Sequence, residues 1–173
     1  YQVGVGVGSK ALKQAADQLG FQQKTGIEIG WEESVGLVGD EPWADRGRGW
    51  AEPGTVPWIP EDMASASIGQ SVVQITPLQL ARAYAVFANG GWLVTPHLAA
   101  GDIDWLSSEH RTKVAIQPST LQTIREGLRK VVEAGTGAGL NGPGIPAAAG
   151  KTGTAEDSTG GPDHAWFGCY APY

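Results

Sequence analysis

The apolar positions of three segments recur at the spacing of an α-helix. The first segment starts at Ser9, a residue type that caps helices, and stops at Gly20, which adopts the left-handed conformation that ends one. Its apolar residues fall on one face: Leu12, Ala15, Ala16 and Leu19. The pattern therefore predicts a short amphipathic helix.

The second segment has the clearest start signal of the chain. Thr76 is placed as the cap and Pro77 at the first helical position, and Gln79 completes a Thr-x-x-Gln capping box. Apolar side chains surround most of the segment, so we predict a buried helix that runs through Ala88 and ends at the Asn-Gly-Gly of residues 89–91.

The third segment opens with another capping box, formed by Ser119 and Gln122, and is closed by the Gly-Thr-Gly of residues 135–137. Its apolar residues again recur at helical spacing: Leu121, Ile124, Leu128, Val131 and Val132. A third helix is therefore predicted.

Two extended runs follow, from Ile145 to Glu156 and from His164 to Tyr170. They flank residues 157–163, all of which are typical of turns. The sequence predicts a β-hairpin here.

Residues 21–60 carry no periodic pattern and are dense in Gly, Pro, Trp and charge. We predict a long ordered loop anchored by Trp43, Trp50 and Trp58, with one short strand at 26–29. Loops of this length usually border a functional cleft, and a flexible connector is the alternative.

Composition narrows the class of protein. At 173 residues and 41% hydrophobic, the chain has the size and apolar content of one globular domain or most of one. A net charge of −6 without a basic run argues against nucleic acid as a partner. The single cysteine, Cys169, and three scattered histidines do not suggest a zinc site, so we expect neither metal nor cofactor.

One motif points to chemistry. Lys151-Thr152-Gly153 matches the Lys-Thr-Gly strand, one of three elements in the signature of penicillin-recognising serine acyltransferases. The other two, Ser-x-x-Lys and Ser-x-Asn or Ser-x-Asp, do not occur in the chain. A phosphate loop would need glycine where Ile145 stands, and it would precede a helix, not a hairpin. A solvent-facing strand with a structural lysine is the plain alternative.

Alternation along this strand would place Lys151 and Gly153 on one face, and Gly150, Thr152 and Thr154 on the other, unless a bulge at Gly153 re-aims them. Glycine at 150 and 153 would let a second backbone approach closely. A cation and two hydroxyls beside an open backbone suit a peptide that ends in a carboxylate.

The chain resembles the class B penicillin-binding proteins, most closely the penicillin-binding protein 2 group. The segments that carry the resemblance occur in the family's order: Leu19-Gly20-Phe21, Lys24-Thr25-Gly26-Ile27, Gly36-Leu37-Val38, Trp58-Ile59-Pro60-Glu61-Asp62, Ser67-Ile68-Gly69-Gln70, Thr76-Pro77-Leu78-Gln79-Leu80-Ala81, Ala88-Asn89-Gly90-Gly91, Gly135-Thr136-Gly137, Gly150 to Glu156 and His164-Ala165-Trp166-Phe167.

This resemblance implies an α+β transpeptidase fold like that of the serine β-lactamases, an antiparallel sheet packed between helices. It further implies a peptidoglycan D,D-transpeptidase that cross-links stem peptides ending in D-Ala-D-Ala through a serine acyl-enzyme and that binds β-lactams covalently. By position, Lys151 would orient the substrate and join the serine's proton network. The hydroxyls of Thr152 and Thr154 would bind the terminal carboxylate beside Gly153, and the Thr154 N–H would serve the oxyanion hole.

The resemblance also implies where this piece belongs. We expect residues 1–173 to be the C-terminal part of one transpeptidase domain, incomplete at both ends and inactive alone. The family lies at the outer, periplasmic face of the bacterial cytoplasmic membrane, anchored by an upstream segment, with cell-elongation membrane proteins as partners. A non-catalytic sensor or scaffold with the same fold is the alternative.

Overall fold

Local capping and periodicity place the two long helices of the computed structural model, which describes residues 1–29, 32–99, 104, 107–156 and 160–173. Helix α5 (Pro77–Ala88) has the predicted bounds. Helix α6 (Pro118–Ala134) also forms, but its cap is Gln117, and Ser119 lies inside the first turn. The predicted capping role of Ser119 is therefore wrong, and its carbonyl accepts a hydrogen bond from Oγ1 of Thr123 at 2.9 Å within the helix.

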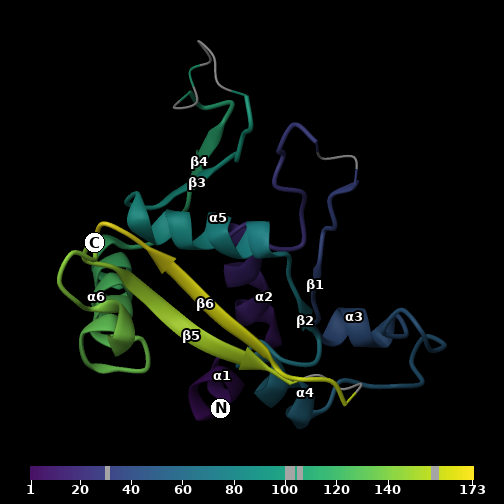
Figure 1. Ribbon diagram of the computed structural model, residues 1–173. Helices are drawn as coiled ribbons and strands as arrows, with labels where there is room; N and C mark the ends of the chain where they lie inside the picture. The colour runs from purple at the N-terminus through teal and green to yellow at the C-terminus, as the bar shows by residue number, and fades with distance from the viewer. Residues whose placement is uncertain (30–31, 100–103, 105–106, 157–159) are drawn as a thin grey trace. The chain divides into compact units, whose positions relative to one another are not determined.

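The predicted hairpin is present. Strand β5 (Ala149–Ala155) pairs antiparallel with β6 (His164–Tyr170), so β5 begins four residues after the predicted start. Helix α6 packs against β5, and helix α5 packs against β6 (Figure 1). Residues 157–159 of the predicted turn lie outside the described part of the chain.

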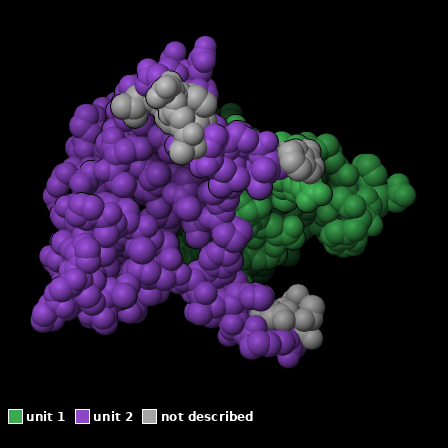
Figure 2. Space-filling view, turned by 45° about the horizontal axis from the view of Figure 1, so that its top comes forward, with its two compact units in different colours: residues 1–24, 32–76 green, residues 25–31, 77–173 purple. Residues whose placement is uncertain are grey.

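The chain divides into two units, coloured separately in Figure 2. Unit 1 comprises residues 1–24 and 32–76, and unit 2 comprises residues 25–31 and 77–173. Unit 2 holds α5, α6, the β5–β6 hairpin and the short 3-10 helix η2 (Ala138–Leu140). Its buried apolar residues are Ala83, Val86, Leu93, Val114, Val132, Ala148 and Ala149.

Unit 2 contains a second hairpin that was not predicted from the sequence. Strand β3 (Trp92–Val94) pairs antiparallel with β4 (Arg111–Lys113). The guanidinium of Arg111 lies 4.4 Å from the centroid of the Trp92 ring, and the Lys113 ammonium lies 4.9 Å from it. These cation–π contacts lie on one face of the hairpin, and the buried residue Leu93 lies on the other.

Unit 1 begins with two helices. Helix α2 (Ser9–Gln18) confirms the first predicted helix, although Gly8 occupies the cap position and Ser9 is its first, buried residue. Helix α1 (Gln2–Val7) was not predicted from its alternating glycines and valines. It lies against helix α4 (Pro60–Ala66), and a Cβ on Gly4 would come within 2.1 Å of the Ser67 Cβ. Glycine is therefore needed for this close contact.

The segment predicted as a loop over residues 21–60 contains more structure than expected. Strand β1 (Leu37–Val38) pairs with β2 (Val73–Gln74), and helix α3 (Glu41–Asp45) is capped by the Asp40 carboxylate, which accepts from the Trp43 N–H at 2.9 Å. No strand forms at 26–29, so that prediction is wrong.

Two further features correct the prediction for this segment. Trp50 is 74% exposed, so its predicted anchoring role is wrong, whereas Trp43 and Trp58 are half-buried. Instead of a strand at 26–29, the Glu28 carboxylate accepts hydrogen bonds from the backbone N–H groups of Leu98 (2.9 Å) and Ala99 (3.2 Å).

No helix in the described residues is long and apolar enough to cross a membrane.

Candidate active site

The four residues of the predicted site lie in succession on β5. The register with β6 is continuous, with Lys151 opposite Gly168, Thr152 opposite Phe167 and Gly153 opposite Trp166. Side chains therefore alternate along β5 as expected, without a bulge at Gly153. Lys151, Gly153 and Thr154 are exposed, and Thr152 is half-buried.

Lys151 lies back along its own strand. Its Nζ donates a hydrogen bond of 2.6 Å to the backbone carbonyl of Thr152, which uses one of the three N–H donors of the ammonium. The side chain is exposed and flexible enough to leave this carbonyl. An incoming carbonyl or carboxylate oxygen can therefore replace the strand carbonyl as the acceptor.

The Thr152 hydroxyl lies on the opposite face of β5 and already has a partner. Its Oγ1 is 2.6 Å from Oγ1 of Thr136, in the turn that follows α6. Thr154 shares this face, opposite Ala165. The two threonines thus present a pair of hydroxyls along the strand, as the sequence predicts. No side-chain role was predicted for Thr136, since Gly135-Thr136-Gly137 was expected to end a helix and was one of the segments that carry the family resemblance.

The two glycines of the strand have different roles. A Cβ at Gly150 would lie 2.5 Å from the Gly168 carbonyl oxygen and 2.7 Å from the Cys169 Cβ, so Gly150 is required by hairpin packing. We expected it to admit a second backbone, and its burial contradicts that role. At Gly153 the nearest atom, the Trp166 Cβ, would be 3.8 Å away. Gly153 therefore fits the expectation of an open approach.

One edge of β5 is available for pairing. Among the described residues, β5 pairs with β6 alone. The backbone N–H and C=O groups along the other edge can therefore receive an extended peptide as an added strand.

Helices α5 and α6 both pack on this hairpin. A Cβ on Gly168 would come within 2.3 Å of the Tyr84 ring, so glycine lets α5 lie directly on β6. Burial raises the pKa of Tyr84, and Cys169 adds to the shift. From α6, Nη1 of Arg129 donates to the Ala148 carbonyl at 2.8 Å, just before β5 begins.

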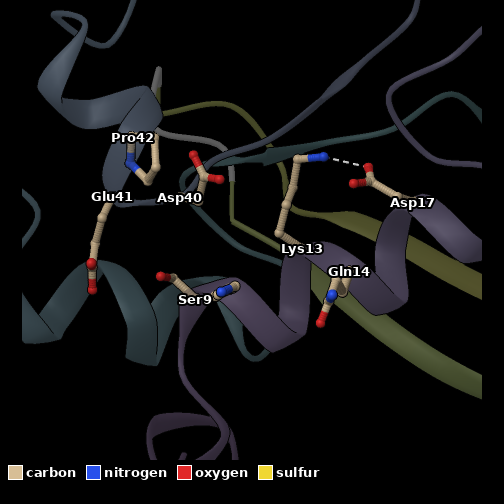
Figure 3. A pocket seen from close by; sticks show the side chains of 8 residues that line it. Ser9, Lys13, Gln14, Asp17, Asp40, Glu41 and Pro42 are labelled. Atoms are coloured by element: carbon tan, nitrogen blue, oxygen red, sulfur yellow. Dashed lines mark hydrogen bonds and ion pairs between the residues drawn. The ribbon is translucent and has the colours of Figure 1, made fainter.

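A cavity of about 400 Å³ in unit 1 contains none of the predicted site residues (Figure 3). Three of the charged residues that line it already have partners within the fold, because Lys13 pairs with Asp17 and Asp40 caps α3. Within the described residues, no group of three or more His, Cys, Asp or Glu side chains is placed to hold a metal ion.

Comparison with proteins of known sequence gives a consistent result. The family model for the penicillin binding protein transpeptidase domain matches residues 1–173. Peptidoglycan D,D-transpeptidase MrdA of Acinetobacter baumannii is 34% identical over 167 residues, which cover 87% of this chain and 22% of that protein. The protein of the same name from Haemophilus influenzae is 31% identical over 100% of this chain and 29% of its own length.

Solved structures agree. Penicillin-binding protein 2 in its complex with MreC, from Helicobacter pylori, superimposes with a TM-score of 0.79 and 29% identity, over 100% of this chain and 31% of that one. Penicillin-binding protein A of Mycobacterium tuberculosis, as an imipenem acyl-enzyme complex, gives a TM-score of 0.70 and 27% identity. The match covers 96% of this chain and 35% of that one. The expected α+β fold is confirmed, and the chain spans only 22% to 35% of the length of these four proteins.

Proposed function

Because the chain belongs to the penicillin-binding protein transpeptidase family, we propose that it forms the C-terminal part of a peptidoglycan D,D-transpeptidase domain. The resemblance to class B penicillin-binding proteins of the type 2 group is confirmed by the MrdA relatives and the penicillin-binding protein 2 structure. The observation that carries the proposal is the open strand β5, with an exposed ammonium at Lys151 and two hydroxyls on its other face.

In the proposed reaction, a serine of a Ser-x-x-Lys element outside this sequence attacks the carbonyl between two D-alanines. The serine oxygen forms an ester with that carbonyl, the peptide bond breaks, and the terminal D-alanine leaves with the proton that the serine gave up. An amine of a neighbouring stem peptide then attacks the ester, forms the cross-link and releases the serine. The penicillin ring is opened by the same serine and remains attached.

The residues of this chain bind and orient the substrate. The terminal carboxylate accepts hydrogen bonds from the hydroxyls of Thr152 and Thr154, while Gly153 keeps the strand open to the peptide backbone. Lys151 turns from the Thr152 carbonyl toward the reacting groups, where its charge assists the proton transfers of the serine. The N–H of Thr154 is one donor to the developing oxyanion.

Other features of the proposal follow from relatives. A β-lactam acyl-enzyme of penicillin-binding protein A supports covalent binding of these antibiotics, and the complex of penicillin-binding protein 2 with MreC supports a partner from the cell-elongation machinery. The proposed location is the bacterial cell envelope, at the periplasmic face of the cytoplasmic membrane, with an anchor outside this sequence.

Labelling of the full-length protein with a fluorescent penicillin tests the proposal. The wild-type protein is expected to form a covalent adduct that survives denaturation. The Lys151→Ala variant should label roughly 100-fold more slowly or worse, because a positioned proton-transfer group contributes about 10²- to 10⁴-fold. Lys130→Ala, which changes an exposed lysine of α6, should label at the wild-type rate.

Two outcomes would count against this function. Equal labelling of the Lys151→Ala and wild-type proteins would remove Lys151 from the site. A folded wild-type protein that binds penicillin reversibly and forms no adduct would contradict the proposed transpeptidase activity. It would favour the non-catalytic sensor or scaffold.

A further inference from the structure

The turn after α6 is built to hold one side chain in a fixed place. The backbone N–H groups of Gly135 and Gly137 both donate to the carbonyl of Val131, at 3.1 and 3.0 Å. A Cβ at Gly135 would lie 2.9 Å from that carbonyl oxygen, so the tight turn requires glycine there. Thr136 is the exposed residue between the two glycines, and its direction is set by the turn.

This turn contacts the face of the hairpin that carries Thr152. A Cβ on Gly137 would be 3.4 Å from the ring of Phe167, the residue opposite Thr152. The two hydroxyl oxygens of Thr136 and Thr152 are 2.6 Å apart, which is within the normal range for O–H···O bonds. The pair therefore joins a side chain of the proposed carboxylate site to a residue with no assigned role.

The direction of this hydrogen bond decides what it can do. A hydroxyl has one hydrogen to donate and accepts through its lone pairs. If Thr152 donates its hydrogen to a substrate carboxylate, the bond to Thr136 requires Thr136 to be the donor and Thr152 the acceptor. A hydroxyl that accepts one hydrogen bond becomes a stronger donor in the next, by about 10–30% in condensed-phase estimates.

We propose that Thr136 is a positioning residue for carboxylate recognition, which donates to Oγ1 of Thr152 and thereby directs the Thr152 hydrogen at the carboxylate of the substrate or the antibiotic. The inference rests on the proposed function, because it assumes that Thr152 contacts this carboxylate.

A purely mechanical role makes a different prediction. The link between α6 and the start of β5 is already made by Arg129, which donates to the Ala148 carbonyl at 2.8 Å. If the hydroxyl pair were only a second tether, its loss would affect all ligands equally. If it orients the Thr152 hydrogen, the loss should affect only ligands that carry a carboxylate.

The experiment compares acylation of the full-length protein by benzylpenicillin and by its methyl ester, with competition against a fluorescent penicillin as the readout. Thr136→Val removes the hydroxyl and keeps the shape, and Thr136→Ser keeps the hydroxyl. With benzylpenicillin, Thr136→Val should weaken the apparent affinity by about fivefold to tenfold, the size expected from one hydrogen bond, and leave the limiting acylation rate unchanged. Thr136→Ser should stay within about twofold of the wild type.

Two controls separate positioning from mechanical support. The apparent affinity for benzylpenicillin, divided by that for its methyl ester, should fall in Thr136→Val. The ester lacks the charged acceptor, so its affinity should not depend on the Thr152 hydrogen. In a Thr152→Val background, Thr136→Val should have no further effect, since its only route to the carboxylate is gone.

Equal losses with both probes, additive effects in the double variant, or wild-type affinity in Thr136→Val would each overturn the positioning role and leave the transpeptidase intact. Failure of the folded wild-type protein to form an adduct would overturn the proposed function and this inference together.

Discussion

Arg48 and Asp62 form a two-point ion pair that closes the loop between α3 and α4. Nη1 of Arg48 donates to Oδ1 of Asp62 at 3.0 Å, and Nη2 donates to Oδ2. Both side chains are only 10% exposed. Asp62 also accepts from the Ile59 N–H at 2.9 Å, and Arg48 donates to the carbonyls of Val56 and Pro57. One ion pair therefore fixes a loop that has little regular structure.

Replacing Asp62 with Asn should lower the free energy of unfolding by about 2–4 kcal/mol, because the Arg48 guanidinium is left without its carboxylate in a mostly buried place. Urea unfolding of the full-length protein, followed by tryptophan fluorescence, measures the change. Asp17→Asn breaks the exposed pair with Lys13 and should cost less than about 1 kcal/mol. Equal losses in the free energy of unfolding for the two variants would contradict a stabilising role of the buried Arg48–Asp62 pair.

The same pair predicts a dependence of stability on pH. The hydrogen bond from Arg48 is the main cause that lowers the pKa of Asp62 in the folded protein. A carboxyl whose folded pKa is depressed stabilises the fold at pH values above its unfolded pKa of about 4. It loses that contribution as the pH falls through its lower folded pKa. The stability difference between wild type and Asp62→Asn should therefore shrink between pH 7 and pH 3. A constant or growing difference would be inconsistent with this sign.

Gly168→Ala should destabilise the packing of β6 on α5. The added Cβ would lie 2.3 Å from Cε2 of the Tyr84 ring, and overpacking of this kind costs about 1–3 kcal/mol. Thermal or urea unfolding measures the loss. The paired variant Gly168→Ala with Tyr84→Ala should lose less than the sum of the two single changes, because the clash is absent once the ring is gone. Strict additivity would argue against this contact.

Gly153→Ala should separate stability from activity. The new methyl group would meet no atom closer than 3.8 Å, so the free energy of unfolding should change by less than about 0.5 kcal/mol. An incoming peptide or penicillin would meet that methyl group, and a displacement of about 1 Å slows a reaction by roughly 100-fold. Penicillin labelling at the wild-type rate would show that Gly153 does not border the bound substrate.

Gly127→Ala should make the protein more stable. Gly127 lies exposed inside α6, and a Cβ there would meet nothing within 4 Å. Alanine in a helix interior is favoured over glycine by about 0.5–1 kcal/mol. The denaturation midpoint should rise while penicillin labelling stays unchanged. A lower midpoint would mean that this part of α6 has a neighbour that the packing described above does not include.

Much of the fold follows from local signals. The bounds of α5 and the C-terminal ends of α2 and α6 were predicted because a cap or a glycine stop lies within a turn of the end that it limits, whereas the caps predicted for α2 and α6 were wrong. The β3–β4 hairpin was missed because its strands have three residues each and its partners, such as Trp92 and Lys113, lie far apart in sequence. The exposure of Trp50 could not be foreseen, since the loop is closed by Arg48, whose partner is fourteen residues away.

In the candidate site, too, some features could be predicted from the sequence and others depend on packing between elements. Lys151 and Thr152 could be placed from the sequence because one strand carries them, and alternation alone fixes which face each side chain takes. The contact of Thr136 with Thr152 joins two elements, so it depends on how α6 packs on β5. The packing role of Gly150 likewise depends on its neighbours in β6, and spacing along β5 contains no information about them.

Strand β5 is held at two points: Arg129 of α6 donates to the carbonyl of Ala148, just before the strand, and Thr136 in the turn after α6 contacts the Thr152 hydroxyl within it. Two attachments four residues apart, about 13 Å along a strand, prevent both sliding and rotation of the strand. Its conformational entropy is thus lost during folding, before any ligand arrives. A peptide that adds to this edge has to order only itself, which leaves more of its contact energy to appear as affinity.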